Sequence, residues 1–240
     1  KEFLETWRLR QIIETYSDHI TWPITITASD DEADAENEPV NKASALWTRP
    51  KSEITEQQYT EFYRHVGGAF DEPWTVLHSR IEGKVEYTLL LFVPTEKPFD
   101  LFHPDRKHRV KLYVKRVFIT DEAEGLAPSY LRFLRGIVDS EDLPLNVSRE
   151  MLQNEPMLRH MRGQIVKRVL GELEKKAEKD PEGFTTFWRN FGAVLKEGIY
   201  EDHEVGPRIL KLARFDSTAG DELTSLSDYV ERMKPGQEAI

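Results

Sequence analysis

Residues 142–153 read DLPLNVSREMLQ, and they divide the chain into two parts of different character. Upstream of this stretch the apolar pattern indicates strands interleaved with helices, and downstream it indicates helices only. Pro144 is incompatible with the interior of a helix or of a central strand, so regular structure is interrupted here. We therefore expect an α/β part over residues 1–155 and a small all-helical part over residues 156–240.

Arg149 stands out in this stretch because of where the next helix would begin. Asn146 or Ser148 can cap a helix whose first turn contains Arg149. The helix macrodipole disfavours a cation in that turn by ~0.3–1 kcal/mol. Arg149 therefore either forms an ion pair within the chain or is free to bind an anion. Its spacing alone favours an ion pair with a nearby carboxylate: Asp139, Glu141 or Asp142.

The composition describes a soluble globular protein with a heavily charged surface. At 240 residues the chain can bury a sizeable core in one large domain or two modest ones. Its net charge of −10 argues against a nucleic-acid-binding protein, which needs a basic surface. The absence of cysteine excludes disulfides, thiolate metal sites and cysteine nucleophiles, and it is compatible with a reducing cytoplasm.

The sequence has no segment of the kind that directs a chain to a membrane. Its first five residues, KEFLE, carry charges where a signal peptide has an apolar core. No apolar run approaches the ~20 residues that span a bilayer. Because the sequence begins without an initiator methionine, we expect it to be a segment cut from a longer protein.

The part before residue 142 alternates between helical and strand-like patterns. Apolar residues at helical spacing predict a helix over residues 3–16, and TEQQ at residues 55–58 fits a capping box before a second helix. Strand-like runs fall at residues 20–27, 74–81, 85–93, 110–119 and 136–138. The dipeptide Glu82-Gly83 between the second and third runs suggests a hairpin, and a short helix is expected over residues 128–134. The break in phase at Arg116-Val117 suggests a bulge or the end of a strand that is buried on both faces. Strands interleaved with helices predict a layered αβα sandwich with a mixed sheet.

The part after residue 155 has helical periodicity throughout. An apolar stripe runs from Met157 to Leu173, and Asp180-Pro181 opens a helix that Gly198 would follow. Two shorter helices are expected at residues 207–215 and 226–233, the second capped by Ser225 or Ser227. We expect the aromatic and methionine stripes of these helices to form core rather than a cofactor site.

No catalytic signature of a common enzyme class occurs in the sequence. A GxxxxGK[ST] phosphate loop, a GxGxxG turn, an HExxH pair and a GxSxG elbow are all absent. His103, Asp105 and His108 come closest to a metal cluster, but their basic neighbours raise the cost of binding a cation, so we expect no metal site. The basic residues of 106–116 are interpreted as a solvated strand face or a surface for an acidic partner domain.

Residues 98–102, PFDLF, place large apolar side chains in a segment rich in proline and charge. Phe99, Leu101 and Phe102 can pack beneath the sheet as a small satellite core. They can also stay partly exposed and contact another protein. Both alternatives are compatible with the sequence.

Residues 139–150, DSEDLPLNVSRE, resemble the catalytic loop of the ninety-kilodalton heat-shock chaperone family, whose bacterial members are called HtpG. Three further stretches resemble the same family in the same order: ALWTR at 45–49, KLYVKRVFI at 111–119 and LTSLSDYVERM at 223–233. Together they cover nearly the whole chain. The resemblance is to the middle segment only, so we expect the N-terminal ATP-binding domain and the C-terminal dimerisation domain to be missing.

The resemblance implies a role in ATP hydrolysis. In that family ATP with Mg²⁺ sits in the N-terminal domain, and the loop of the middle segment closes onto it. By resemblance Arg149 is the arginine that reaches the γ-phosphate, and Gln153 is its companion one helical turn later. A guanidinium suits that role because its fixed fork of donors can neutralise charge spread over the phosphoryl oxygens. The full-length protein would then be an ATPase and a cytoplasmic homodimer, and the isolated segment would be inactive.

The resemblance also implies that unfolded or partly folded client proteins are partners. By resemblance Phe99, Leu101 and Phe102 hold such clients, and Phe70, which lies where eukaryotic relatives tend to have tryptophan, can contact them as well. Two alternatives differ in function. One is a stand-alone interaction module in which the LPLNVSRE loop is only a structural cap, and the other is a self-contained hydrolase that uses the carboxylates Asp139, Glu141 and Asp142.

Overall fold

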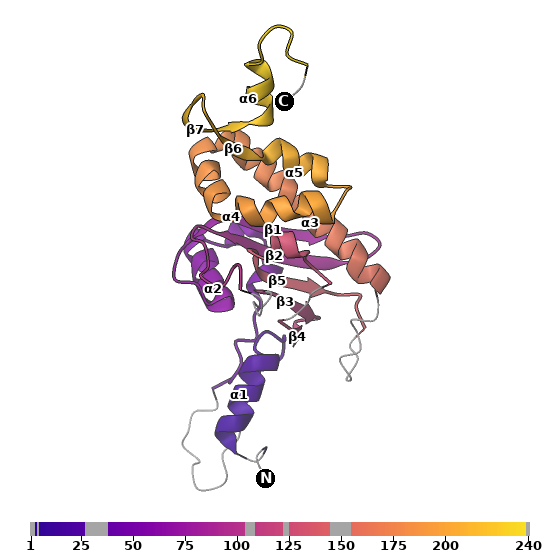
Figure 1. The fold of residues 1–240 in the computed structure, drawn as a ribbon. Coiled ribbons are helices and arrows are strands. Elements are labelled where there is room, and N and C mark those ends of the chain that lie inside the picture. The colour runs from indigo at the N-terminus through magenta and orange to yellow at the C-terminus, as the bar shows by residue number, and fades with distance from the viewer. Residues whose placement is uncertain are drawn as a thin grey trace.

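The computed structural model describes residues 3, 5–26, 38–103, 109–121, 125–144 and 155–238. At its centre lies a mixed sheet (Figure 1) made of β1 (Pro73–Ile81), β2 (Tyr87–Pro94), β3 (Arg109–Val114), β4 (Val117–Thr120) and β5 (Arg135–Ser140). The spatial order is β1-β2-β5-β3-β4, and neighbouring strands are antiparallel except β3 and β5, which are parallel. The central strand is therefore β5, and all of its residues are buried.

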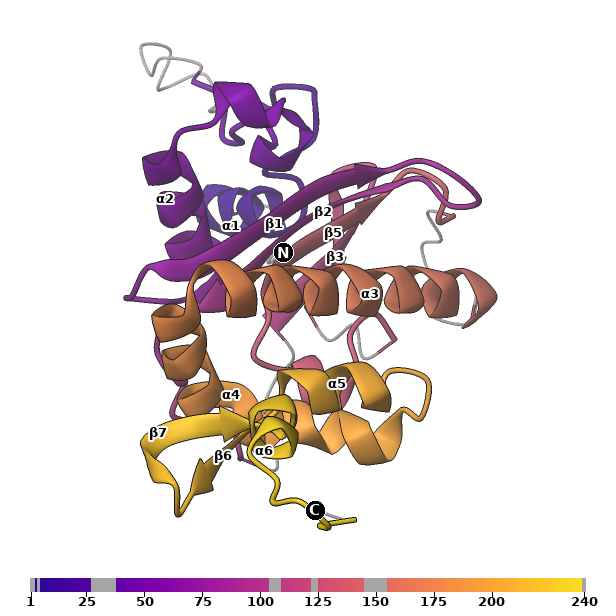
Figure 2. The same cartoon turned by 90° about the horizontal axis from the view of Figure 1, so that it is seen from above.

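Helices cover both faces of the sheet (Figures 1 and 2). One face carries α2 (Glu56–Gly67), and the other carries α3 (Glu155–Lys179), α4 (Pro181–Glu201) and α5 (Gly206–Leu212). Along β2, Leu91 packs into the core on the side of α3 and α4, and its neighbour Phe92 packs into the core on the side of α2. Successive side chains of a strand point to opposite faces, so β2 contributes to both cores. The predicted αβα sandwich with a mixed sheet is confirmed.

The first helix, α1 (Thr6–Tyr16), projects away from the sheet and contributes no buried residue (Figure 1). The ring of Tyr16 lies 5.8 Å from the ring of Phe118 on β4, which brings the end of α1 against the edge of the sheet. Across the part of the chain that the structure describes, no helix combines the length and the apolar character needed to cross a membrane.

The boundary predicted at residue 155 falls within one continuous core. The larger cluster of buried apolar residues includes Val138 on β5 and Ile165 on α3, one from each side of that boundary. The helical part therefore packs directly on the sheet, and the division of the chain into two parts stays a prediction.

Three helices begin where their sequences predict, each with a side-chain cap. Thr55 accepts a hydrogen bond from the backbone N–H of Gln58, whose side chain accepts one from the N–H of Thr55, so the capping box of α2 is confirmed. Asp180 accepts a hydrogen bond from the N–H of Gly183 at the start of α4. Ser225 forms a capping box at the start of α6 (Leu226–Glu231).

The strand predicted over residues 20–27 is wrong for residues 20–26, and residue 27 lies outside the described residues. The side chain of Asn41 forms hydrogen bonds that a neighbouring strand would otherwise form. Its Oδ1 accepts a hydrogen bond from the N–H of Ile24 at 2.7 Å, and its Nδ2 donates one to the carbonyl of Trp22 at 3.0 Å. These backbone groups are satisfied without a ladder, so the alternating pattern does not produce a strand.

The run predicted as one strand over residues 110–119 forms two strands, β3 and β4. Lys115 and Arg116 join them with φ angles of 51° and 67°. Two consecutive positive φ angles reverse the chain in a tight hairpin. The break in phase at Arg116-Val117 therefore marks a turn after β3, whose last three residues are buried, and not a bulge.

The helical part contains a hairpin that the sequence analysis missed. β6 (Arg214–Ser217) pairs with β7 (Gly220–Ser225) in an antiparallel sheet of two strands. The helix predicted over residues 207–215 accordingly ends at Leu212 as α5, because Arg214 and Phe215 belong to β6.

Gly198 lies inside α4, not past its end as predicted. A Cβ at this position would lie 2.6 Å from Cδ1 of Ile209 and 2.8 Å from the ring of Tyr130. The missing side chain lets α4 approach α5 and the 3-10 helix η5 (Ser129–Leu131), which stands where a short α-helix over residues 128–134 was predicted. Gly198 is thus a packing residue.

Candidate functional site

The predicted catalytic residues Arg149 and Gln153 lie outside the described residues, which stop at Pro144 and resume at Glu155. The structure describes the point from which that segment leaves the sheet, at the end of β5. Residues 139–144 therefore form the described root of the predicted catalytic loop.

Asp139 is the buried centre of this root, with a residue exposure of 3%. One of its oxygens accepts a hydrogen bond from the indole N–H of Trp47 at 2.7 Å, and the other accepts one from the backbone N–H of Arg116 at 3.1 Å. Burial raises the pKa of Asp139, and the two hydrogen bonds offset this rise only in part. The carboxylate thus joins three segments: the 3-10 helix η3 (Leu46–Thr48), the β3–β4 turn and the end of β5.

Trp47 is held from its backbone as well as from its ring. Nε2 of His78 on β1 lies 2.8 Å from the carbonyl oxygen of Trp47 and therefore carries the proton that it donates. Nδ1 of His78 lies 2.7 Å from the hydroxyl of Tyr59 on α2, which donates to it. Burial lowers the pKa of His78, which favours this neutral form. The ALWTR stretch is thus part of a buried hydrogen-bonded network that supports the root.

The residues after Asp139 leave the sheet in a defined turn. The Ser140 hydroxyl oxygen accepts hydrogen bonds from the backbone N–H groups of Asp142 and Leu143, and Leu143 is buried. The carboxylate of Asp142 accepts a hydrogen bond from the N–H of Glu86 at 2.6 Å. This turn fixes the direction of the chain as far as its last described residue.

A hollow of about 450 Å³ lies beside the root, between η3, the β1–β2 hairpin and the β3–β4 turn. Most of its charged lining side chains are basic: Arg49, Lys51, Arg80 and Arg116, against Glu86 and Glu141. Of the described basic residues between 106 and 116, Arg116 alone is part of this lining. Both interpretations of that basic stretch, a solvated strand face or a surface for an acidic partner domain, therefore stay predictions.

The predicted client-binding residues divide into exposed and buried side chains. Phe70 is 98% exposed, Phe99 is 100% exposed and Phe102 is 54% exposed. Leu101 is only 4% exposed and packs into the main core, so of the two alternatives left open for residues 98–102 the buried one holds for Leu101 and the exposed one for Phe99 and Phe102. Burial of Leu101 anchors the segment whose neighbouring rings point outward. We refer to residues 95–103 as the aromatic loop.

The carboxylate of Asp71 joins the turn that contains Phe70 to the start of the aromatic loop. One of its oxygens accepts a hydrogen bond from the hydroxyl of Tyr63 at 2.7 Å. The other accepts hydrogen bonds from the backbone N–H groups of Thr95 and Glu96 at 3.1 and 3.0 Å. Two loops with fully exposed rings, Phe70 in one and Phe99 in the other, are therefore held together by one side chain.

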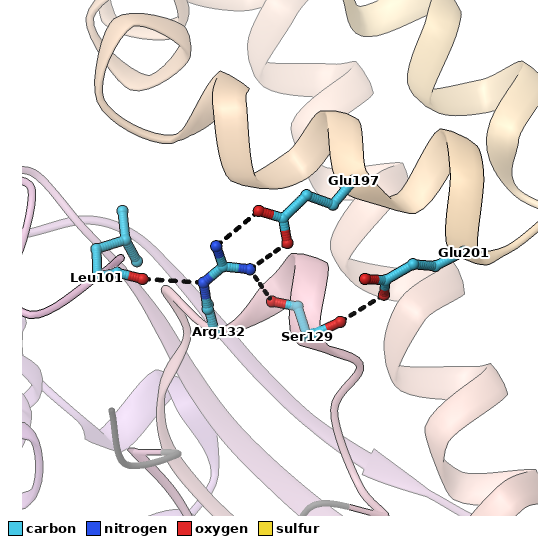
Figure 3. Close-up of polar contacts among 5 residues, drawn as sticks. All are labelled: Leu101, Ser129, Arg132, Glu197 and Glu201. Carbon is cyan, nitrogen blue, oxygen red and sulfur yellow. Dashed lines mark hydrogen bonds and ion pairs between the residues drawn. The ribbon is translucent and has the colours of Figure 1, made fainter. Parts of the chain in front are cut away.

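Arg132 anchors the other end of the aromatic loop (Figure 3). Its Nε donates a hydrogen bond to the carbonyl of Leu101 at 2.9 Å, and its guanidinium pairs with both carboxylate oxygens of Glu197 on α4. The same guanidinium lies 5.7 Å from the ring centre of Phe102. Between these anchors Asp100 pairs with Arg109 of β3 at 2.6 Å. The aromatic loop is therefore fixed along its length although two of its rings are exposed.

Within the described ranges, no three histidine, aspartate or glutamate side chains are placed to hold a metal ion. His103 belongs to these ranges, whereas Asp105 and His108 lie outside the described residues. The expected absence of a metal at this cluster therefore stays a prediction.

Comparison with known sequences gives the family. The sequence model described as "Hsp90 protein" matches residues 30–240 of the chain. The chain belongs to the Hsp90 family. It is 62% identical over 240 residues to the chaperone protein HtpG of Paramagnetospirillum magneticum, and 58% identical over 242 residues to that of Rhodospirillum rubrum. Each alignment covers 100% of this chain and 38% of the relative, so the chain spans little more than a third of their length.

The sequence singles out the aromatic rings but not the side chains that hydrogen-bond to their loops. Asp71 and Arg132 have no local pattern that marks them, because their partners lie far along the chain; Glu197 is 65 residues from Arg132. The sequence indicates Asp139 only as a partner for Arg149 or as a catalytic carboxylate. Its hydrogen bond to Trp47, 92 residues away, gives it a structural role that the sequence did not indicate.

Proposed function

We propose that the chain is the middle segment of an ATP-dependent molecular chaperone of the HtpG type. In this proposal it binds unfolded or partly folded client proteins through Phe70, Phe99 and Phe102. It also supplies Arg149 to ATP held by the N-terminal domain of the same protein. The observation that carries the proposal is the full exposure of Phe70 and Phe99 on loops that hydrogen bonds hold in place. Membership of the Hsp90 family supports it independently.

Exposed rings on fixed loops suit the binding of unfolded chains. Burying apolar surface against a partner is favourable, so exposed rings can contribute to the binding of another protein. The fixed backbone of the aromatic loop reduces the conformational entropy that would be lost on binding. An unfolded client presents apolar side chains in no fixed order, so separate rings can each contact one without a shaped pocket.

The ATPase part of the proposal rests on the family and on the residues of the loop. A guanidinium at Arg149 can donate a fork of hydrogen bonds to a phosphoryl group, and in other nucleotide hydrolases such an arginine contributes on the order of 10³–10⁵ in rate. Gln153 would assist it one helical turn later. Mg²⁺ and ATP would be bound by the N-terminal domain, and the full-length protein would act as a cytoplasmic homodimer.

The client-binding part is tested by replacing the exposed rings with serine. We expect Phe99→Ser with Phe102→Ser to weaken binding of an unfolded protein about tenfold, because a few aromatic side chains carry most of the energy of an interface. The melting temperature should change by less than about 3 °C, since both rings are largely exposed.

Leu101→Ser is the matched control, because Leu101 belongs to the same loop but is buried. It should lower the melting temperature by more than about 5 °C through the loss of core packing. Unchanged client affinity in the double variant would refute client binding by the aromatic loop. A lost thermal transition in that variant would show that the rings are core.

A further inference from the structure

Arg132 lies where the aromatic loop, η5 and α4 meet (Figure 3). Its side chain is only 5% exposed, and it donates hydrogen bonds to the carbonyls of Leu101 and Ser129 as well as to Glu197. Beside this pair the hydroxyl of Ser129 donates a hydrogen bond to Glu201 on the same helix. Arg132 thus connects a loop of the α/β part to a helix of the helical part.

The chemistry of a guanidinium makes this connection stiff. Its donors lie in one plane at fixed angles, and a carboxylate accepts two of them side by side. Arg132 uses one edge for the two oxygens of Glu197 and its Nε for the carbonyl of Leu101. The position of Leu101 relative to α4 is therefore set by a rigid group. Phe102, whose ring packs over the same guanidinium, follows it.

We propose that Arg132 and Glu197 are positioning residues for client binding, through which α4 sets the geometry of the aromatic loop. The proposed role presupposes the client binding proposed above. Arg132 is too deeply buried to contact a client itself, so its effect must act through Leu101 and Phe102. A rearrangement of α4 would then change client affinity. A bound client would in turn favour one arrangement of α4 over another, because such coupling is reciprocal.

The chain contains a matched control for this pair. Arg208 on α5 pairs with both oxygens of Glu174 on α3 at 2.8 Å, in the same two-pronged geometry. This second pair joins two helices of the helical part and has no hydrogen bond to the aromatic loop among the described residues. Breaking this pair removes the same kind of arginine–carboxylate interaction and leaves the contacts of the aromatic loop in place.

The experiment compares Arg132→Lys, Glu197→Gln and the control Arg208→Lys in the folded chain. The probe is reduced, carboxymethylated lactalbumin, a soluble protein that stays unfolded. We expect Arg132→Lys and Glu197→Gln to weaken its binding about three- to tenfold, and Arg208→Lys to leave it unchanged.

Amide exchange gives a second readout that a general loss of stability would not reproduce. The N–H groups of Leu101 and His103 are hydrogen-bonded within the aromatic loop, to Pro98 and Asp100. Their exchange should accelerate in Arg132→Lys and Glu197→Gln but not in Arg208→Lys. If Arg132→Lys fails to fold, Glu197→Gln decides, since it keeps the shape of the side chain and one acceptor.

Each outcome separates this inference from the proposed function. If Phe99→Ser with Phe102→Ser weakens binding but Glu197→Gln binds like the wild type, the positioning role is refuted and client binding stands. If Arg208→Lys weakens binding as much as Arg132→Lys, the effect is general destabilisation and the positioning role is again refuted. If the double phenylalanine variant binds unchanged, client binding by this loop is refuted, and the positioning role with it.

Discussion

Replacing Asp139 with asparagine should destabilise the fold, although it removes a buried charge. The carboxylate accepts one hydrogen bond on each oxygen, from the Trp47 indole and from the Arg116 backbone. An amide has one acceptor oxygen, so its NH₂ group must face one of these donors. A buried donor left without a partner costs about 1–3 kcal/mol. Burial disfavours the charged form of Asp139, which raises its pKa. The neutral amide of asparagine avoids this cost of burying a charge, which offsets part of the loss.

We therefore expect a net loss of about 1–2 kcal/mol in the free energy of unfolding, seen as a fall of about 2–8 °C in melting temperature. Chemical denaturation of Asp139→Asn, Trp47→Phe and the double variant measures it. In the Trp47→Phe background the amide oxygen can accept the hydrogen bond from the backbone N–H of Arg116, and no indole donor competes for it. Asp139→Asn should therefore lower the free energy of unfolding by less in that background. An equal cost in both backgrounds, or a more stable Asp139→Asn protein, would refute the assignment of Asp139 as the acceptor that joins these segments.

The remaining predictions concern pH, helix packing and the exposed loops. Burial lowers the pKa of His19 and His78, so the stability they contribute is fully present above the unfolded value of about 6.5 and is lost as pH falls below it. The melting temperature should therefore be lower at pH 5 than at pH 7.5. In His78→Gln the melting temperatures at the two pH values should lie closer together. Gly198→Ala should cost about 1–3 kcal/mol by overpacking in thermal unfolding. Gly163→Ala, which meets nothing within 4 Å on α3, should instead stabilise by about 0.5–1 kcal/mol. Asp71→Asn should weaken client binding several-fold, and unchanged affinity would show that it does not orient the rings.

The parts of the fold that follow from local sequence were predictable. The capping box at Thr55 and the cap at Asp180 need only neighbours in the chain, and both are present. The alternating runs around Glu82-Gly83 form the predicted hairpin of β1 and β2. The catalytic role predicted for Arg149 rests on the family resemblance alone, because no pattern of spacing could assign it, and it stays a prediction.

The missed features depend on partners distant in sequence. Residues 20–26 alternate like a strand, but the side chain of Asn41 binds the N–H of Ile24 and the carbonyl of Trp22. The β6–β7 hairpin is short and largely exposed, so it lacks the buried apolar alternation that marks a strand. Leu101 and Phe99 lie two residues apart in the same loop, yet only the tertiary packing shows that one is buried and the other exposed.

The most direct test of the proposed function is ATP turnover by the full-length protein, with wild type compared against Arg149→Ala and Arg149→Lys. Nucleotide affinity is measured on all three. The proposal predicts that turnover collapses in both variants while affinity holds, because lysine keeps the charge but loses the fork of donors. Unchanged turnover in Arg149→Ala would contradict the proposal and would make Arg149 a structural ion-pair residue.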